Sequence, residues 1–147
     1  MTKNKKVFVI HGPNLNMLGI REPDLYGKMT LAEIDAKMKQ IGEDIGLTVE
    51  TFQSNHEGEI VDKIQKAVEN CNGLIINPAA YTHTSIAIRD ALLLLDVTII
   101  EVHLSNVYKR ESFRHKSMIS DIVTAKMAGF GANGYFLAIK AMELLIS

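Results

Sequence analysis

Hydrophobic and polar residues form two kinds of pattern along the chain: short runs rich in β-branched residues, and longer stretches in which apolar residues recur at helical spacing. The short runs predict strands at residues 7–10, 47–52, 74–76, 97–102 and 119–125. Between and after them, apolar residues recur every three or four positions and predict helices over 30–45, 57–71, 84–95 and 135–146. Thr30-Leu-Ala-Glu33 is a capping box, and Gly46 and Asn72-Gly73 are stop signals for the first two helices.

The five predicted strands are interleaved with four predicted helices, and the strands are almost continuously apolar, which is typical of a parallel sheet buried on both faces. We therefore expect an α/β fold: a five-stranded parallel sheet with helices on both faces. Because no linker, repeat or low-complexity tract interrupts the pattern, residues 1–147 are expected to form a single domain. Ligands of such sheets bind beyond the carboxyl ends of the strands. The segments to examine are therefore 11–16, 53–56, 77–85 and 103–106.

The amino-acid composition limits the classes of binding partner and the cellular compartment that we expect. Sixteen basic and seventeen acidic residues give a net charge of −1, so a nucleic-acid partner is not expected. The single cysteine, Cys71, excludes an intramolecular disulfide and a cysteine metal cluster, as in a reducing compartment. No apolar run is long enough for a signal peptide or a membrane span, which predicts a cytoplasmic chain without a membrane partner.

Glu101-Val-His103 ends the fourth predicted strand. Residues two apart on a strand point to the same face, so the carboxylate can lie beside the imidazole. A carboxylate there orients the ring and favours its protonated form, which prepares a general acid. A strand-end histidine satisfied by a salt bridge is the alternative.

Arg21-Glu-Pro-Asp-Leu-Tyr26 lies in a connection long enough to be a lid. A phenol is a poor base at neutral pH, but a guanidinium against it favours the phenolate, so Tyr26 could act as a base with Arg21 beside it. The alternative is an ordinary exposed loop anchored by a tyrosine.

The turn from Asn77 to Ser85 follows a strand and opens a helix. It offers an amide, an imidazole, hydroxyls and helix-start N–H groups to a small polar anion, or it holds only caps and a buried asparagine. Arg114 could meet a hydroxyl or carboxylate, or be a solvated charge. His83, Ser85 and Asp90 are the residue types of a hydrolase triad, but the hydroxyls of this turn look more like helix caps.

Gly129-Phe-Gly-Ala-Asn-Gly134 fits the dinucleotide pattern G-x-G-x-x-G. Too little chain follows for the returning strand of a nucleotide-binding unit, which favours a glycine turn into the last helix. The five histidines show no H-x-x-x-H spacing, so a metal site could be assembled only through space.

Taken together, six ordered segments resemble the type II 3-dehydroquinate dehydratases, from about Val7 to Leu144. They are His11 to Asn16, Arg21 to Gly27, Gln53 to Gly58, Asn77 to Ser85, Glu101 to Asn106, and Phe113-Arg-His115. The chain departs from the family pattern around Tyr108-Lys109 and at Asp121 to Ala128.

The resemblance implies a flavodoxin-like fold and a lyase of the shikimate pathway. It would eliminate water from 3-dehydroquinate to give 3-dehydroshikimate through an enolate, without metal or organic cofactor. By this resemblance Tyr26 is the base for the C2 proton and Arg21 depresses its pKa. Asn14 holds the water that stabilises the enolate oxygen, and His103, backed by Glu101, protonates the departing hydroxyl.

The resemblance also implies substrate-binding residues, which hold the carboxylate and hydroxyls: Asn77, His83, Leu104, Ser105 and Arg114. Asp90 is similar to a residue that reaches a neighbouring subunit's site, in a homododecamer of four trimers. Two other classes stay open from the residues alone: a non-catalytic flavodoxin-like module that binds a flavin or nucleotide, and a structural subunit that serves only assembly.

Overall fold

The computed structural model describes residues 4–20, 24 and 27–146 of the 147-residue chain. Within them the strands are β1 (Lys5–His11), β2 (Leu47–Gln53), β3 (Gly73–Asn77), β4 (Thr98–His103) and β5 (Ala125–Ala128). The α-helices are α2 (Leu31–Asp44), α3 (Glu57–Ala67), α4 (Ile86–Leu92) and α5 (Asn133–Ile146). Four short 3₁₀ turns accompany them: η1 (Leu15–Met17), η2 (Ala79–His83), η3 (Val107–Lys109) and η4 (Ser112–Arg114).

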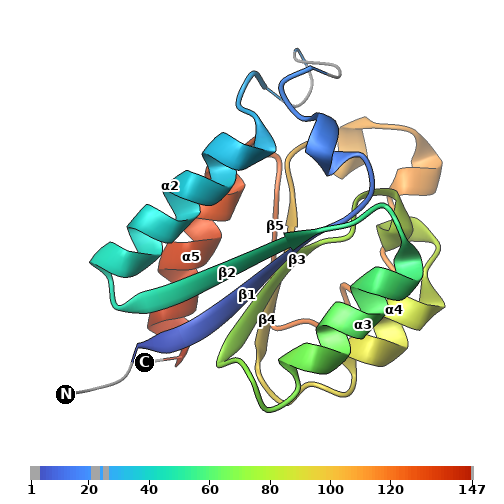
Figure 1. The fold of residues 1–147 in the computed structure, drawn as a ribbon. Coiled ribbons are helices and arrows are strands. Elements are labelled where there is room, and N and C mark those ends of the chain that lie inside the picture. The colour runs from blue at the N-terminus through green and yellow to red at the C-terminus, as the bar shows by residue number, and fades with distance from the viewer. Residues whose placement is uncertain (1–3, 21–23, 25–26, 147) are drawn as a thin grey trace.

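The strands form one parallel sheet in the order β2-β1-β3-β4-β5 (Figure 1). This confirms the predicted α/β class and the flavodoxin-like arrangement. The strand order reverses between β1 and β3, whose last residues, His11 and Asn77, pair with each other. Sheets of this order bind ligands at that reversal, beyond the carboxyl ends of the strands.

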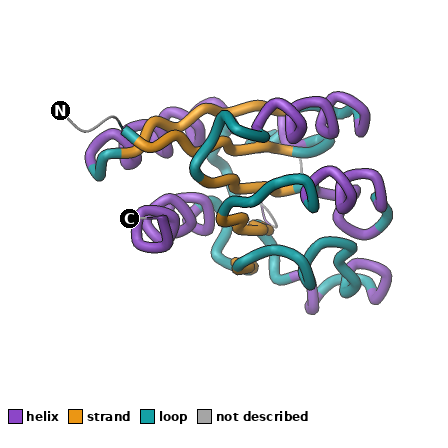
Figure 2. Tube along the Cα trace, turned by 90° about the horizontal axis from the view of Figure 1, so that it is seen from below, coloured by secondary structure: helices purple, strands orange, loops and turns teal. Residues whose placement is uncertain are grey.

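Helices cover both faces of the sheet, as Figure 2 shows from below. Helices α2 and α5 pack on one face, where Met38 and Ile139 are fully buried in an apolar cluster with strand residues such as Val9. Helices α3 and α4 pack on the other, where Ile64 is buried with strand residues such as Ile10. Neighbouring strand residues point to opposite faces, and both faces are covered, which explains the nearly continuous apolar runs.

The helix boundaries follow local caps. Thr30 Oγ1 accepts a hydrogen bond from the Glu33 amide at 3.2 Å, and α2 begins at the predicted position. Helix α3 ends at Ala67 rather than at residue 71, because Glu69 adopts a left-handed φ of 67°. Helix α4 is also shorter than predicted. It begins only after Ser85, whose hydroxyl accepts a hydrogen bond from the Ile88 amide at 2.9 Å.

The predicted fifth strand at 119–125 is wrong, since β5 occupies Ala125–Ala128. Ile119 is buried in the apolar cluster under α3 and α4 instead of in the sheet. The chain reaches the sheet edge at Thr124, whose amide donates to the Ile99 carbonyl at 2.9 Å. Apolar residues can fill a core from a turn as well as from a strand, so their run alone misplaced the element.

Among the described residues, no helix combines the length and the apolar character needed to cross a membrane.

Candidate active site

One cavity opens beyond the carboxyl ends of the central strands. Seven of the predicted site residues line it: Asn14, Asn77, His83, His103, Leu104, Ser105 and Arg114. Leu15, Leu18 and Val107 add apolar surface to the wall. An enclosed site with a few converging polar groups is the usual form of a small-molecule pocket.

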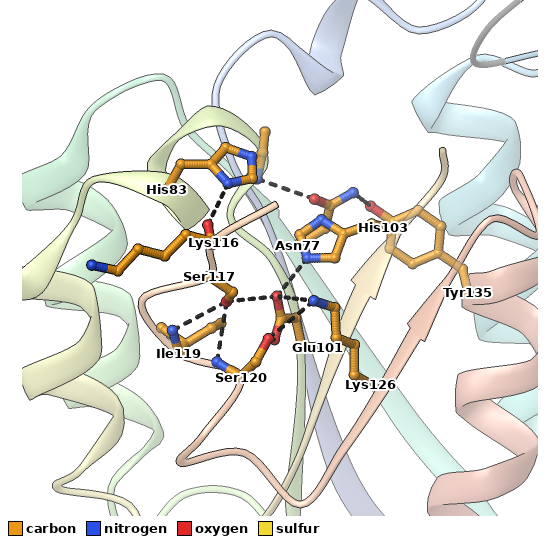
Figure 3. Close-up of polar contacts among 11 residues, drawn as sticks. Asn77, His83, Glu101, His103, Lys116, Ser117, Ile119, Ser120, Lys126 and Tyr135 are labelled. Carbon is orange, nitrogen blue, oxygen red and sulfur yellow. Dashed lines mark hydrogen bonds and ion pairs between the residues drawn. The ribbon is translucent and has the colours of Figure 1, made fainter. Parts of the chain in front are cut away.

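His103 and Glu101 form a buried pair at the end of β4 (Figure 3). His103 Nε2 lies 2.5 Å from Glu101 Oε2, and the Glu101 side chain is completely buried. Burial alone raises the pKa of Glu101. The hydrogen bond and charge of His103, a hydrogen bond from Ser120 and the charge of Lys126 outweigh this and hold that pKa below its ordinary value. Glu101 is therefore a carboxylate that orients the imidazole.

Three further side chains hold the Glu101 carboxylate, and sequence reasoning missed all of them. The Ser117 hydroxyl donates to Oε2 at 3.0 Å, the Ser120 hydroxyl donates to Oε1 at 2.6 Å, and Lys126 Nζ lies 3.9 Å from Oε2. The two serines precede β5 in a turn-rich segment, where no periodicity indicates which way they point. Lys126 lies beside Glu101 because β5 pairs with β4, a pairing that the sequence pattern does not indicate.

A second buried network lies behind Asn77. Its Nδ2 donates to the Tyr135 hydroxyl at 3.0 Å, while its Oδ1 accepts from the Ala79 amide at 3.1 Å. The Tyr135 oxygen is 2.9 Å from His11 Nδ1, and His11 Nε2 is 2.8 Å from Asp35 Oδ1. Complete burial raises the pKa of Tyr135, so its phenol stays protonated. The hydroxyl donates a hydrogen bond to His11 Nδ1. This chain of hydrogen bonds fixes the Asn77 amide. No local pattern in the sequence indicates that Tyr135 or Asp35 takes part.

His83 faces the cavity in its neutral form. Burial first, and then the positive charges of His103 and Arg114, lower the pKa of His83, although its hydrogen bond to the Lys116 carbonyl opposes the shift. Its Nδ1 donates to that carbonyl at 2.8 Å, which leaves Nε2 as the nitrogen available to a ligand.

The turn after β1 is held by the segment after β2. The Gly12 amide donates to the Asn77 carbonyl at 2.7 Å, and Gln53 Nε2 donates to the Gly12 carbonyl at 3.1 Å. Asn55 Oδ1 accepts from the Asn14 amide at 3.0 Å. Asn14 itself has a left-handed φ of 68°, a conformation that asparagine tolerates well. The contacts of residues 53–55 thus place Asn14 at the cavity.

The remaining predicted residues divide into three groups. Leu104 and Ser105 are buried directly after β4, and Arg114 Nε donates to Glu111 Oε1 at 3.0 Å from the end of η4. Asp90 is exposed on α4 and does not line the cavity. Arg21 and Tyr26 lie outside the described residues.

The glycine turn at 129–134 donates hydrogen bonds to the backbone at the end of β4. The Gly129 amide donates to the His103 carbonyl at 3.3 Å, and the Gly131 amide donates to the Leu104 carbonyl at 2.9 Å. These amides therefore bind the protein's own backbone, and the turn leads into α5 as the glycine-turn interpretation expects.

The doubly wound parallel sheet and the polar cavity at its strand-order reversal define a flavodoxin-like α/β protein with a small-molecule site. Residues 5–143 match the family model described as Dehydroquinase class II. The chain belongs to this family.

Relatives and solved structures agree with this membership. The 3-dehydroquinate dehydratase of Endomicrobium trichonymphae is 54% identical over 142 residues, which cover 97% of this chain and 99% of that protein. The crystal structure of type II dehydroquinase from Propionibacterium acnes has a TM-score of 0.94 at 41% identity, covering 98% of this chain and 99% of the other. That from Butyrivibrio crossotus has a TM-score of 0.93 at 45% identity, covering 96% and 99%.

Proposed function

We propose that the chain is a type II 3-dehydroquinate dehydratase: it removes water from 3-dehydroquinate to give 3-dehydroshikimate, a step of the shikimate pathway. The observation that carries this function is the buried His103–Glu101 pair at the wall of a cavity that also presents Asn77 and Arg114. Relatives that carry this name match nearly the whole chain.

The first chemical step is proton removal beside a ketone, which produces an enolate and needs a base and a partner for the oxyanion. Tyr26 takes the C2 proton as a phenolate, with Arg21 favouring its ionised form. A water held by Asn14 stabilises the enolate oxygen. Asn14 lines the cavity, which supports this role.

In the second step the enolate electron pair forms the new C1–C2 double bond, and the C1 hydroxyl leaves as water with a proton from His103. His103 Nε2 is engaged with Glu101, so the transferred proton comes from Nδ1. Glu101 stays ionised throughout and keeps the ring in one orientation. A base and an acid on opposite sides of the substrate suit an anti elimination, which proceeds without a metal or organic cofactor.

Substrate binding uses the other side chains of the cavity. The Arg114 guanidinium, the Ser105 hydroxyl and the residue after β4, Leu104, hold the carboxylate and hydroxyls together with the Asn77 amide and neutral His83. The buried network behind Asn77 supports this assignment, because a fixed amide can select one orientation of a small polyol acid.

The test is to mix the protein with 3-dehydroquinate and follow the absorbance of the conjugated enone product. Wild type should give product, His103→Ala should lose nearly all turnover, and His56→Ala, at an exposed histidine, should behave as wild type. A chelator should leave the rate unchanged. Folded wild-type protein that forms no product would exclude this function; co-purification of a flavin or nucleotide would instead favour a non-catalytic binding module.

We further propose a homododecamer of four trimers in which Asp90 reaches a neighbouring subunit's site. Ile86, Leu93 and Leu94 support an interface there, because these apolar side chains are 59%, 57% and 59% exposed, at the start of α4 and directly after its end, close to Asp90 in the sequence. Light scattering should give the mass of twelve chains for wild type and a smaller particle for Ile86→Asp. A monomeric wild type at assay concentration would contradict this assembly.

We also propose that residues 1–147 act as one domain in the cytoplasm. Both apolar clusters pack on the same sheet, which supports a single cooperative unit. Urea unfolding should then show one transition by both circular dichroism and fluorescence, and cell fractionation should recover the protein with the cytoplasmic enzymes. Two separate transitions, or recovery with membranes, would contradict these proposals.

A further inference from the structure

Lys126 lies directly opposite Glu101 across the β4–β5 ladder. Its Nζ is 3.9 Å from Glu101 Oε2 and donates to the Ser120 hydroxyl at 3.1 Å. The Ser120 hydroxyl in turn donates to Glu101 Oε1 at 2.6 Å (Figure 3). The ammonium therefore reaches the carboxylate both directly and through a hydroxyl. Lys126 falls within 121–128, where the sequence departs from the pattern it otherwise resembles.

The Glu101 carboxylate is thus shared between the His103 ring and the Lys126 ammonium. His103 contacts it from the cavity side, and Lys126, 23% exposed, contacts it from the edge strand. Burial makes these interactions stronger than they would be in water, and a hydroxyl that accepts from an ammonium becomes a better donor to the carboxylate. The Lys126 ammonium partly neutralises the charge of the Glu101 carboxylate. The carboxylate therefore stabilises a protonated His103 ring less than it would without Lys126.

We propose that Lys126 is a positioning residue of the acid group: by sharing the Glu101 carboxylate, it makes the protonated His103 ring a stronger acid toward the leaving hydroxyl. The inference rests on the proposed function for its catalytic meaning. Lys126 does not line the cavity, so it acts only through Glu101 and Ser120.

Other charged and titratable groups also face His103. Glu101 lies beside it on β4, His83 faces it from η2, and Arg110 and Arg114 share its cavity. Replacing Lys126 removes none of these groups. A change in the titration of the ring on replacing Lys126 therefore reports the loss of this one charge.

The experiment compares Lys126→Met, which keeps most of the apolar stem, with Lys126→Arg, which keeps the charge. Lys140→Met, at an exposed lysine of α5, is the matched control. Two quantities are measured: the pH profile of kcat, and the titration midpoint of the His103 ring by NMR without substrate. Lys126→Met should move the alkaline limb of kcat and the NMR midpoint upward by about half a unit to one unit, the effect of a partly screened unit charge. It should also lower kcat several-fold with little change in KM.

Lys126→Arg and Lys140→Met should stay close to wild type in both readouts. An unmoved NMR midpoint in Lys126→Met would overturn the proposal, even if the protein were less stable. Equal shifts in Lys126→Met and Lys126→Arg would also overturn it, because charge would then not be the cause. Lys126→Gln repeats the test should the methionine variant fold poorly. The NMR titration needs no turnover, so an inactive wild type would refute the proposed function and still leave the Lys126 coupling measurable.

Discussion

Replacing Glu101 by glutamine removes one charge from the acid group and preserves its shape. The wild-type carboxylate accepts from His103 at 2.5 Å, Ser117 at 3.0 Å and Ser120 at 2.6 Å. The two hydroxyls can turn to suit an amide, but the imidazolium loses its counterion. A hydrogen bond to a charged group contributes about 1.5–3 kcal/mol, which corresponds to roughly ten-fold to 150-fold in rate. We therefore expect kcat to fall about 100-fold, within the usual contribution of a general acid.

The assay is formation of the enone product as a function of pH, with Glu43→Gln, at an exposed glutamate of α2, as control. Glu101→Gln should stay well below wild type in kcat across the whole pH profile, because the His103 ring has lost the carboxylate that orients it. The control should match wild type. If Glu101→Gln kept kcat within about two-fold of wild type across the profile, the acid role of the pair would be refuted.

The same variant tests how Glu101 couples stability to pH. Its pKa lies below the ordinary value of 4.5 in the folded protein, so the ionised carboxylate stabilises the fold at pH above that value. This stabilisation is lost as the pH falls through the folded pKa. The unfolding free energy of wild type, relative to Glu101→Gln, should therefore decline on acidification in urea titrations. A difference between the two proteins that does not change with pH would contradict the shift.

Three further substitutions probe other parts of the site. Tyr26→Phe should abolish turnover while ligand binding by calorimetry is retained; retained turnover would remove Tyr26 from the base role. Tyr135→Phe should lower the unfolding free energy by about 1–3 kcal/mol and raise KM, because the buried Asn77 amide loses the hydroxyl to which it donates. Unchanged stability and KM would contradict the role of this network. Gly12→Ala should reduce kcat/KM strongly, because the added Cβ would collide with the backbone of Pro78 at the cavity; a crystal structure with an undisplaced turn would contradict this.

The pattern of apolar residues predicted the sheet, its parallel strands and the helices on both faces. Those features depend on burial that extends over many residues, such as the run at β3, which is buried throughout. Errors arose where one local conformation decided the outcome. The left-handed backbone at Glu69 ended α3 early, and Ile119 filled the core from a turn, which displaced the predicted strand.

In the candidate site, too, some residues were predicted from the sequence and others were not. The rule that ligands bind beyond parallel strands, together with the family resemblance, placed His103, Asn77 and Arg114 around one cavity. The supporting side chains were not foreseen. Ser120 and Tyr135 reach the site from later segments through tertiary packing, and nothing in their local sequence indicates the group that each one contacts.

The most direct test of an acid and a base on opposite sides of the substrate uses 3-dehydroquinate labelled with deuterium at one C2 position. Two stereoisomers are prepared, with the label either anti or syn to the C1 hydroxyl, and the product is analysed by mass spectrometry. We expect the anti label to be lost and the syn label to be kept in 3-dehydroshikimate. Loss of the syn label, or scrambling of both, would contradict an elimination in which Tyr26 and His103 act from opposite sides.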